Sequence, residues 1–312
     1  MINTMVSVQL PTDEVLNIKK NRLQPISATG SEKRIAIVTG IHGDELEGQY
    51  VAYELVKRIT ANMSSLHGIV DVYPTINPLG MESVMRAVPM SGLDMNKVFP
   101  GSETGAIAEH IAAALVEDIR GADVCVDIHA SNIFIREIPQ VRISRENSRR
   151  LLSYAKLLNT DFVWVHDSNA VGSGSLAETL NNEGVPTLVI EMGVGQRITR
   201  AYGRQLLTGI FRLMSDLGIW SGSEESVTHP MISTDGAVKV IHADESGIFI
   251  PYVEHNIWVQ KGTVIGEIVT PVSGTVEQEI TAPADGLIFS LREYPIVYEG
   301  SVIARILSMN DE

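Results

Sequence analysis

Residues 34–59 read RIAIVTGIHGDELEGQYVAYELVKRI: an apolar run, a turn rich in polar residues, and then a periodic segment. The run at 34–39 is mostly β-branched, which predicts a buried strand. Apolar residues from Val51 to Ile59 recur at intervals of three and four, which predicts an amphipathic helix. A strand that leads directly into a helix is the repeating unit of an α/β protein.

The same alternation of strand and helix patterns continues to about residue 217. Further strand patterns occupy 69–77, 122–131, 162–166 and 187–193, and helix patterns occupy 105–120, 149–158, 176–183 and 199–217. Strands that alternate with helices form a sheet whose helices cover both faces. We therefore expect an α/β domain with a mostly parallel, mixed sheet between two helical layers.

The pattern changes after residue 223. Short alternating segments follow, punctuated by glycine, proline and aspartate, and no helical period is present. Such a composition predicts an all-β region. We therefore expect two domains, one at 1–225 and a smaller one at 226–312.

The C-terminal region contains an internal repeat. The segment KGTVIGEIV at 261–269 aligns with EGSVIARIL at 299–307, and ADESGIF at 243–249 aligns with APADGLIF at 282–289. Two similar halves predict a small barrel, and they resemble the halves of biotinyl and lipoyl carrier domains. A carrier has a lysine on the hairpin between its halves, but no lysine follows Lys261. We expect the fold of such a domain without the modification.

Charge and hydropathy exclude several classes of partner. The formal net charge is −14, with 24 basic against 38 acidic residues, and no long basic run is present. A protein that binds nucleic acid through phosphates needs clustered Lys and Arg, so none is expected as a partner. No apolar segment approaches the roughly 20 residues that span a bilayer, and the N-terminus lacks a secretory pattern. We expect a cytoplasmic protein that binds no membrane.

Several polar residues follow the predicted strands at their carboxyl ends. They are His42, Asn77, His129, His166 and Glu191. In open α/β sheets, ligands bind beyond the carboxyl ends of the strands. We expect these residues to share one edge of the sheet and to form a ligand site there, with His166 and the adjacent Asp167 as candidates to line it.

His42 and Glu45 form a candidate metal-binding pair. They lie three residues apart in a turn between a strand and a helix, and zinc accepts both His nitrogen and Glu oxygen as ligands. A catalytic zinc needs a third protein ligand and an open position, and His129 is the natural candidate. Asp127, two residues earlier, could orient one imidazole. Taken alone, the pair could be solvated and His129 could be a buried structural histidine.

Glu191 ends the run TLVIE at 187–191, which otherwise reads as a buried strand. A carboxylate in such a run needs a partner or a function, because burying an unpaired charge is costly. A water activated by a metal needs a general base, and a half-buried Glu suits that role. Glu191 is therefore the candidate base.

Four motifs together resemble the succinylglutamate desuccinylase/aspartoacylase family of zinc carboxypeptidase-like hydrolases. They are GIHGDELEG at 40–48, NPLGMESVMRAVPMSGLDMNKVFPG at 77–101, DIHAS at 127–131 and VIEMG at 189–193, in this order. The resemblance spans about 34–195, and the repeated β region also resembles members of that family. It implies a zinc carboxypeptidase-like fold in which His42, Glu45 and His129 hold one zinc ion per chain.

The resemblance also implies roles for residues around the zinc. Glu191 would be the general base and proton shuttle, and Arg86 would polarise the scissile carbonyl and stabilise the oxyanion. Asn96 and Lys97 would bind a substrate carboxylate. The family usually has Arg at the second of these positions, and Lys is a point charge rather than a bidentate fork. The substrate is therefore expected to be a different acid, or to lack a carboxylate at that place.

The main hypothesis is a zinc-dependent hydrolase that cleaves the amide bond of a small N-acylated amino acid or amine. Two alternatives stay open at this point. One is a carboxypeptidase-like metallopeptidase that acts on small peptides, and the other is a metal-dependent small-molecule binding protein without turnover. The β region could also serve to form a homo-oligomer.

Overall fold

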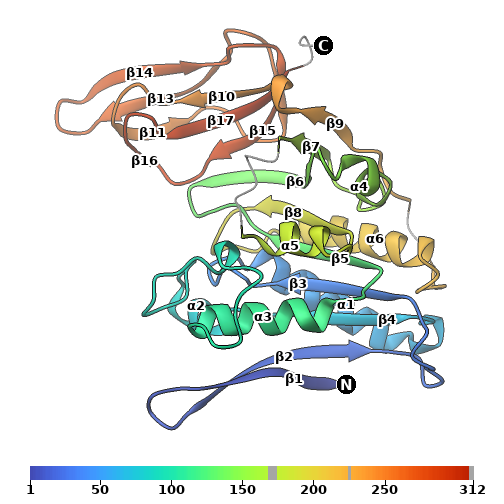
Figure 1. The fold of residues 1–312 in the computed structure, drawn as a ribbon. Coiled ribbons are helices and arrows are strands. Elements are labelled where there is room, and N and C mark those ends of the chain that lie inside the picture. The colour runs from blue at the N-terminus through green and yellow to red at the C-terminus, as the bar shows by residue number, and fades with distance from the viewer. Residues whose placement is uncertain (168–173, 224–225, 309–312) are drawn as a thin grey trace.

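The computed structural model describes residues 1–167, 174–223 and 226–308. It contains a mixed sheet of 13 strands and a second sheet of four strands (Figure 1). The elements up to residue 217 are β1 (Ile2–Gln9), β2 (Val15–Leu23), β3 (Arg34–Thr39), α1 (Glu47–Ala61), β4 (Ile69–Tyr73), α2 (Pro78–Ser83), α3 (Ile107–Ile119), β5 (Val124–His129), β6 (Ile135–Ser144), α4 (Ser148–Ala155), β7 (Phe162–His166), α5 (Leu176–Asn182), β8 (Thr187–Gly193) and α6 (Arg200–Asp216).

The elements after residue 226 are nearly all strands. They are β9 (Met231–Thr234), β10 (Val238–His242), β11 (Gly247–Pro251), β12 (Ile257–Val259), β13 (Val264–Thr270), β14 (Thr275–Thr281), β15 (Gly286–Arg292), β16 (Ile296–Val297) and β17 (Val302–Ser308). Short 3₁₀ turns occur at Met63–Ser65, Met95–Lys97 and Asp235–Ala237. No helix in the described ranges is long and apolar enough to cross a membrane.

The centre of the large sheet has the predicted α/β arrangement. Strands β4, β3, β5 and β8 lie side by side and run parallel. Helices α1, α4 and α6 bury apolar side chains in the core on one face, and α3 and α5 do so on the other. The expected sheet between two helical layers is confirmed, and the carboxyl ends of β3, β5 and β8 meet at one edge.

Two parts of the sheet were not predicted from the sequence. The β1–β2 hairpin extends one side of it, and β6 extends the other. Strand β6 runs antiparallel to β8 and parallel to β7, so β7 also runs against the central strands. The expectation that His166 shares an edge with the other polar residues is therefore wrong. His166 pairs with Ser144 and lies near the start of β8, not near its end.

The C-terminal strands form an antiparallel β region whose two repeats have the same pairing. In the first repeat β11 pairs with β13, and in the second β15 pairs with β17. Equivalent residues such as Ile265 and Ile303 are buried in one shared core. The predicted domain boundary at 225/226 falls beside positions 224–225, which lie outside the described residues, and it stays a prediction.

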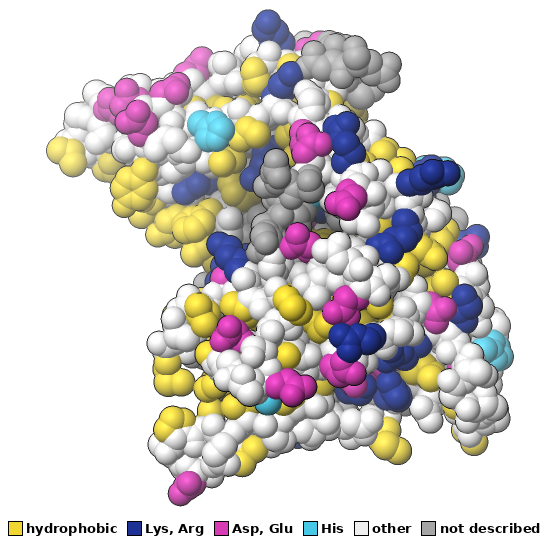
Figure 2. Space-filling model, in the orientation of Figure 1, with side chains coloured by type: hydrophobic (Ala, Val, Ile, Leu, Met, Phe, Trp, Pro, Cys, Tyr) yellow, Lys and Arg dark blue, Asp and Glu magenta, His cyan; other side chains and the backbone are white. Residues whose placement is uncertain are grey.

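The C-terminal region is joined to the main body by hydrogen bonds. Strand β15 pairs antiparallel with β6, so the large sheet continues from one region into the other. In the space-filling view a notch separates the C-terminal strands from the larger body on one side (Figure 2). The β6–β15 pairing places C-terminal side chains within reach of the site described next.

Candidate active site

His42, Glu45 and His129 come together at the carboxyl ends of β3 and β5. The ligand atoms of the three residues all lie within 4.8 Å of one another. Nδ1 of His42 is 2.7 Å from Oε1 of Glu45, and Nδ1 of His129 is 2.9 Å from Oε2 of Glu45. All three side chains are buried. The predicted trio therefore forms one compact donor cluster.

The glycines of the motif allow the tight turn that carries His42 and Glu45. Gly40 has a φ of +67°, a backbone conformation that residues with a Cβ rarely adopt. A Cβ on Gly43 would lie 2.1 Å from the backbone of Gly80, at the start of α2. The turn therefore packs directly against α2, and this contact holds both side chains toward the end of β5.

Each imidazole has a carboxylate beside its far nitrogen. Nε2 of His42 is 3.0 Å from Oδ1 of Asp94, and Nε2 of His129 is 3.1 Å from Oδ2 of Asp127. Such outer carboxylates orient histidine ligands and raise their basicity in zinc sites. Asp127 lies where the sequence predicted an orienting group. Asp94 was missed, although it lies within the motif that contains Asn96.

The donor cluster fits a tetrahedral metal ion. Two ligand atoms about 2.0–2.1 Å from a tetrahedral zinc are roughly 3.3 Å apart, and the Nδ1 atoms of His42 and His129 are 3.2 Å apart. Burial lowers the pKa of both histidines, but nearby carboxylates outweigh this effect and raise each pKa above its usual value. Burial raises the pKa of Glu45, but the two histidines outweigh it and the net pKa is lowered. A cation can replace the protons that hold this cluster together.

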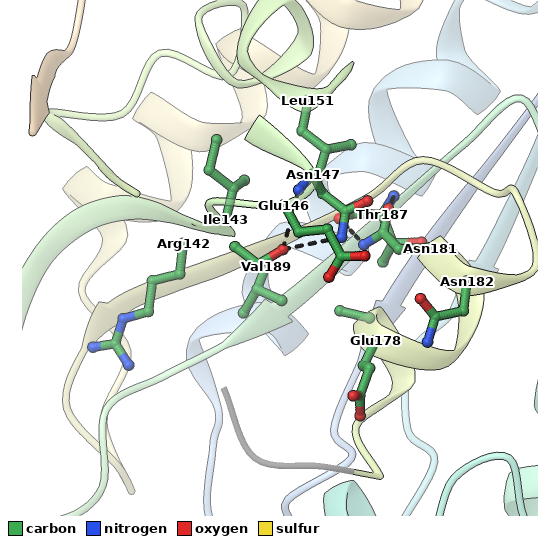
Figure 3. Close-up of a pocket in the computed structure, with 12 residues that line it drawn as sticks. Arg142, Ile143, Glu146, Asn147, Leu151, Glu178, Asn181, Asn182, Thr187 and Val189 are labelled. Carbon is green, nitrogen blue, oxygen red and sulfur yellow. Dashed lines mark hydrogen bonds between the residues drawn. The ribbon is translucent and has the colours of Figure 1, made fainter. Parts of the chain in front are cut away.

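A cavity of about 210 Å³ opens beside the donor cluster. Its lining residues are His42, Arg86, Asn96, His129, Arg142, Trp164, His166, Ser175, Val189 and Glu191. A second cavity of similar volume adjoins it and shares Arg142 and Val189 (Figure 3). His166 thus lines the cavity, although its strand, β7, runs antiparallel to the central strands. Asp167 is exposed and pairs with Arg145 instead.

Glu191 faces this cavity next to the donor cluster. It pairs with His129 in the register of β5 and β8, and 18% of its side chain is exposed. Burial raises the pKa of Glu191 to about 7, against the lowering effect of Arg142 and His129. A carboxyl group that titrates near neutrality is suited to take up and release a proton.

Arg86 and Asn96 lie at the cavity, but Lys97 does not line it. Nη1 of Arg86 donates to Oε1 of Glu45 at 2.7 Å, and 42% of the Arg86 side chain is exposed. Oδ1 of Asn96 accepts the backbone N–H of Leu176 at the start of α5. Lys97 is exposed and is not among the residues that line either cavity. Six of the seven site residues expected from the resemblance are therefore brought together.

Arg142 is the charged residue of this cavity that sequence reasoning missed. It lies on β6, which was not predicted because Pro139 and several charged residues interrupt its apolar pattern. One signal was present, since Val141 and Ile143 flank Arg142 and alternate with it as in a half-buried strand. Residues on such a strand point to opposite faces in turn, so this alternation separates Arg142 from its apolar neighbours.

The chain is similar to known proteins over most of its length. Residues 31–217 match the family described as the succinylglutamate desuccinylase/aspartoacylase catalytic domain. An N-alpha-acetyl-L-2,4-diaminobutyric acid deacetylase from Halomonas elongata is 26% identical over 281 residues, which cover 87% of this chain and 81% of that protein. This family match and this relative extend the likeness beyond the four motifs.

Solved structures have the same fold. The product-bound ectoine utilization protein from Ruegeria pomeroyi superposes with a TM-score of 0.82 at 18% identity, over 96% of this chain and 92% of that one. A succinylglutamate desuccinylase/aspartoacylase from Rhodobacter sphaeroides superposes with a TM-score of 0.80 at 21% identity, over 96% of this chain and 91% of that one. Both likenesses include the C-terminal strands, since they cover nearly the whole chain.

Proposed function

Because the chain belongs to the succinylglutamate desuccinylase/aspartoacylase family, we propose that it is a zinc-dependent hydrolase that cleaves the amide bond of a small N-acylated amino acid or amine. The observation that carries this proposal is the buried donor cluster of His42, Glu45 and His129 on the same cavity as Glu191. Two nitrogens and one oxygen are a donor set that suits a catalytic zinc, and the cavity provides the open position.

His42, Glu45 and His129 would hold the zinc ion, and Asp94 and Asp127 would keep the two imidazoles in place. A bound zinc ion supplies Lewis acidity, which polarises a carbonyl and lowers the pKa of water. Arg86 contacts Glu45, so its guanidinium lies close to where a carbonyl oxygen would be bound. A positive charge at that place stabilises negative charge that develops on the oxygen.

Glu191 would move the proton. As a carboxylate it removes a proton from the attacking water, and as the acid it then delivers that proton to the nitrogen of the leaving amine. Its position beside His129 and its pKa of about 7 support both steps, since each form is accessible near neutral pH. One side chain can therefore serve as base and then as acid.

The size of the site supports a small substrate. The cavity beside the donor cluster has a volume of about 210 Å³, below the roughly 300–1,000 Å³ of typical pockets for drug-sized ligands. The relative from Halomonas elongata is named for its action on N-alpha-acetyl-L-2,4-diaminobutyric acid. N-Acetylated amino acids and diamino acids are therefore the first compounds to test.

The test is amine release from a panel of N-acyl amino acids, N-acyl diamines and dipeptides by the zinc-loaded protein. We expect release from N-acyl compounds, and a loss of about 10²–10⁴-fold in Glu191→Gln with one zinc still bound per chain. Faster cleavage of dipeptides would support the metallopeptidase alternative. Zinc and ligand binding without release from any compound would support the binding-protein alternative, and a Glu191→Gln variant with the wild-type rate would remove Glu191 from the mechanism.

A further inference from the structure

Arg142 lies where the two cavities meet. It pairs with Val189 across β6 and β8, and Val189 lies two residues before Glu191, so all three side chains are on one face of the sheet. Nη1 of Arg142 is 3.5 Å from Oε1 of Glu191. In Figure 3 the guanidinium points away from Asn147 and Asn181, two asparagines that line the second cavity. The guanidinium is therefore directed toward the cavity beside the donor cluster.

The charge of Arg142 is only partly compensated. Its Nη2 donates to both oxygens of Glu137 at 2.8 and 3.0 Å, but Glu137 also accepts a hydrogen bond from Arg305 at 2.7 Å. One buried carboxylate thus serves two guanidinium groups, so Glu137 alone does not balance their charge. Glu191 is the other carboxylate in ion-pair contact with Arg142 among the described residues, and the proposed reaction needs it for proton transfer.

Arg142 also has unused hydrogen-bonding capacity. Its Nε is buried and, within the part of the chain that the structure describes, has no hydrogen-bond partner. Leaving a buried donor unpaired is costly, so such a group is expected to meet an acceptor in the working protein. The carbon of the guanidinium lies 5.4 Å from the ring centroid of Trp164, whose Nε1 is fixed by Asp235 at 2.7 Å. This contact holds the guanidinium plane in place.

We infer that Arg142 determines substrate specificity by binding a carboxylate of the substrate. This inference rests on the proposed function and deepens it, because it assigns recognition of the substrate carboxylate to a residue of β6. A guanidinium donates charge-assisted hydrogen bonds to a carboxylate in fixed directions, which lysine cannot match in geometry. Arg142 thus supplies inside the cavity the guanidinium that position 97 lacks, since Lys97 lies outside it.

The carboxylate can be on either side of the scissile amide, and two matched pairs of compounds separate these cases. N-Acetyl-L-alanine and N-acetyl-L-alaninamide differ in a carboxylate on the amine side. N-Ethylsuccinamate and N-ethylbutanamide differ in a carboxylate on the acyl side. Steady-state rates for all four compounds are compared in the zinc-loaded wild type, Arg142→Met, Arg142→Lys and a control.

We expect Arg142→Met to raise KM for the carboxylate member of one pair by about 10- to 100-fold, the range for a hydrogen bond to a charged group. The neutral member should change by no more than about twofold, and Arg142→Lys should be intermediate. The control is Arg136→Met, which removes an arginine from the same strand that pairs with Glu293 and lines neither cavity. It should leave both members unchanged.

Equal losses for both members of each pair would overturn the inference and make Arg142 a positioning residue for Glu191. The inference would also be overturned if Lys97→Met, and not Arg142→Met, selectively lost activity on the carboxylate member of a pair. Calorimetric titration of the same compounds into Glu191→Gln protein, with and without Arg142→Met, measures binding without turnover. If the wild type hydrolyses none of the compounds, the proposed function fails, and this titration still tests the carboxylate site. Circular dichroism identifies a variant that fails to fold, in which case Arg142→Lys carries the test.

Discussion

The metal half of the site comes from parallel strands, whereas its arginine half comes from antiparallel ones. The metal half is His42, Glu45 and His129, at the ends of the neighbouring strands β3 and β5. The arginine half is Arg142, Glu137 and Arg305, on β6 and β17, which join the sheet through antiparallel pairs. One site thus combines a part built from neighbouring strands with a part assembled from segments that are distant in the sequence.

The two halves also differ in how charge is balanced. In the metal half one carboxylate lies between two imidazoles, each backed by a further carboxylate, so the cluster attracts a cation. In the arginine half one carboxylate lies between two guanidinium groups, so the cluster attracts an anion. Glu191 lies between the halves and contacts Arg142 while it pairs in register with His129. Changes to either half should therefore have separable effects.

The largest effect is expected from breaking the metal half. His129→Ala should abolish stoichiometric zinc and reduce turnover to background, because a catalytic zinc site does not tolerate the loss of one of three protein ligands. Zinc content after dialysis, measured by mass spectrometry, checks this. His67→Ala is a matched control, because His67 is exposed and its side chain is hydrogen-bonded to Ser221, away from the donor cluster. A His129→Ala protein that binds one zinc with unchanged affinity would contradict the ligand assignment.

A smaller effect is expected from weakening the metal half without removing a ligand. Asp94→Asn keeps an acceptor for Nε2 of His42 and for the N–H of Asn96 but removes the charge. We expect zinc affinity to fall by about 10- to 100-fold, as is typical for an outer hydrogen-bond partner. Competition with a chromophoric chelator measures this. An affinity equal to that of the wild type would show that Asp94 does not tune the site.

A still smaller effect is expected from a change in the arginine half that acts on Arg142 only through Glu137. Arg305→Met leaves Glu137 with Arg142 alone, which draws Arg142 away from the cavity. We expect KM for the carboxylate compound to rise about two- to tenfold, in the range of coupling between interacting side chains, with one zinc still bound. Kinetics on the matched pairs test this. A loss of zinc would mean that the two halves are not independent.

The smallest effect is a shift of the pH profile. The proposed mechanism needs Glu191 as a carboxylate, and burial raises the pKa of this side chain to about 7. The positive charge of a bound zinc ion would lower this value, so kcat/KM should fall on the acidic side with a midpoint below about pH 7. Because Arg142 also lowers the pKa of Glu191, Arg142→Met should move the acidic limb toward higher pH, and Arg142→Lys should not. An unchanged limb in Arg142→Met would show that the contact between the two residues is weak in the zinc-loaded enzyme.

Much of the metal half could be predicted because its signals are local. His42 and Glu45 lie in one turn, and His129 and Glu191 each end an apolar run. Because ligands bind beyond the carboxyl ends of parallel strands, these four residues could be expected at one site. Asp94 was missed because nothing in its local pattern shows that it meets His42, which lies 52 residues earlier. A long loop brings it there, and loop geometry does not follow from hydrophobic periodicity.

The arginine half could not be predicted because a register shift creates it. Between Glu137 and Gln140, β6 has one residue more than β8 opposite it, and Pro139 lies in this irregularity. Residues five apart on a regular strand point to opposite faces, yet Glu137 and Arg142 are hydrogen-bonded on one face. Arg305 joins them because β15 connects β6 to β17 in the same sheet.

The amino-acid sequence alone determined the α/β class, the β-rich C-terminal repeat and the residue types of the donor cluster. These features depend on periodicity and on residue types at strand ends, which are visible within a few residues. Only the tertiary structure decided the strand direction of β6 and β7, the place of Lys97 outside the cavity and the meeting of Arg142 with Glu137 and Arg305. The first and last of these features depend on strand pairing between segments up to 168 residues apart, and the place of Lys97 depends on the loop that carries it.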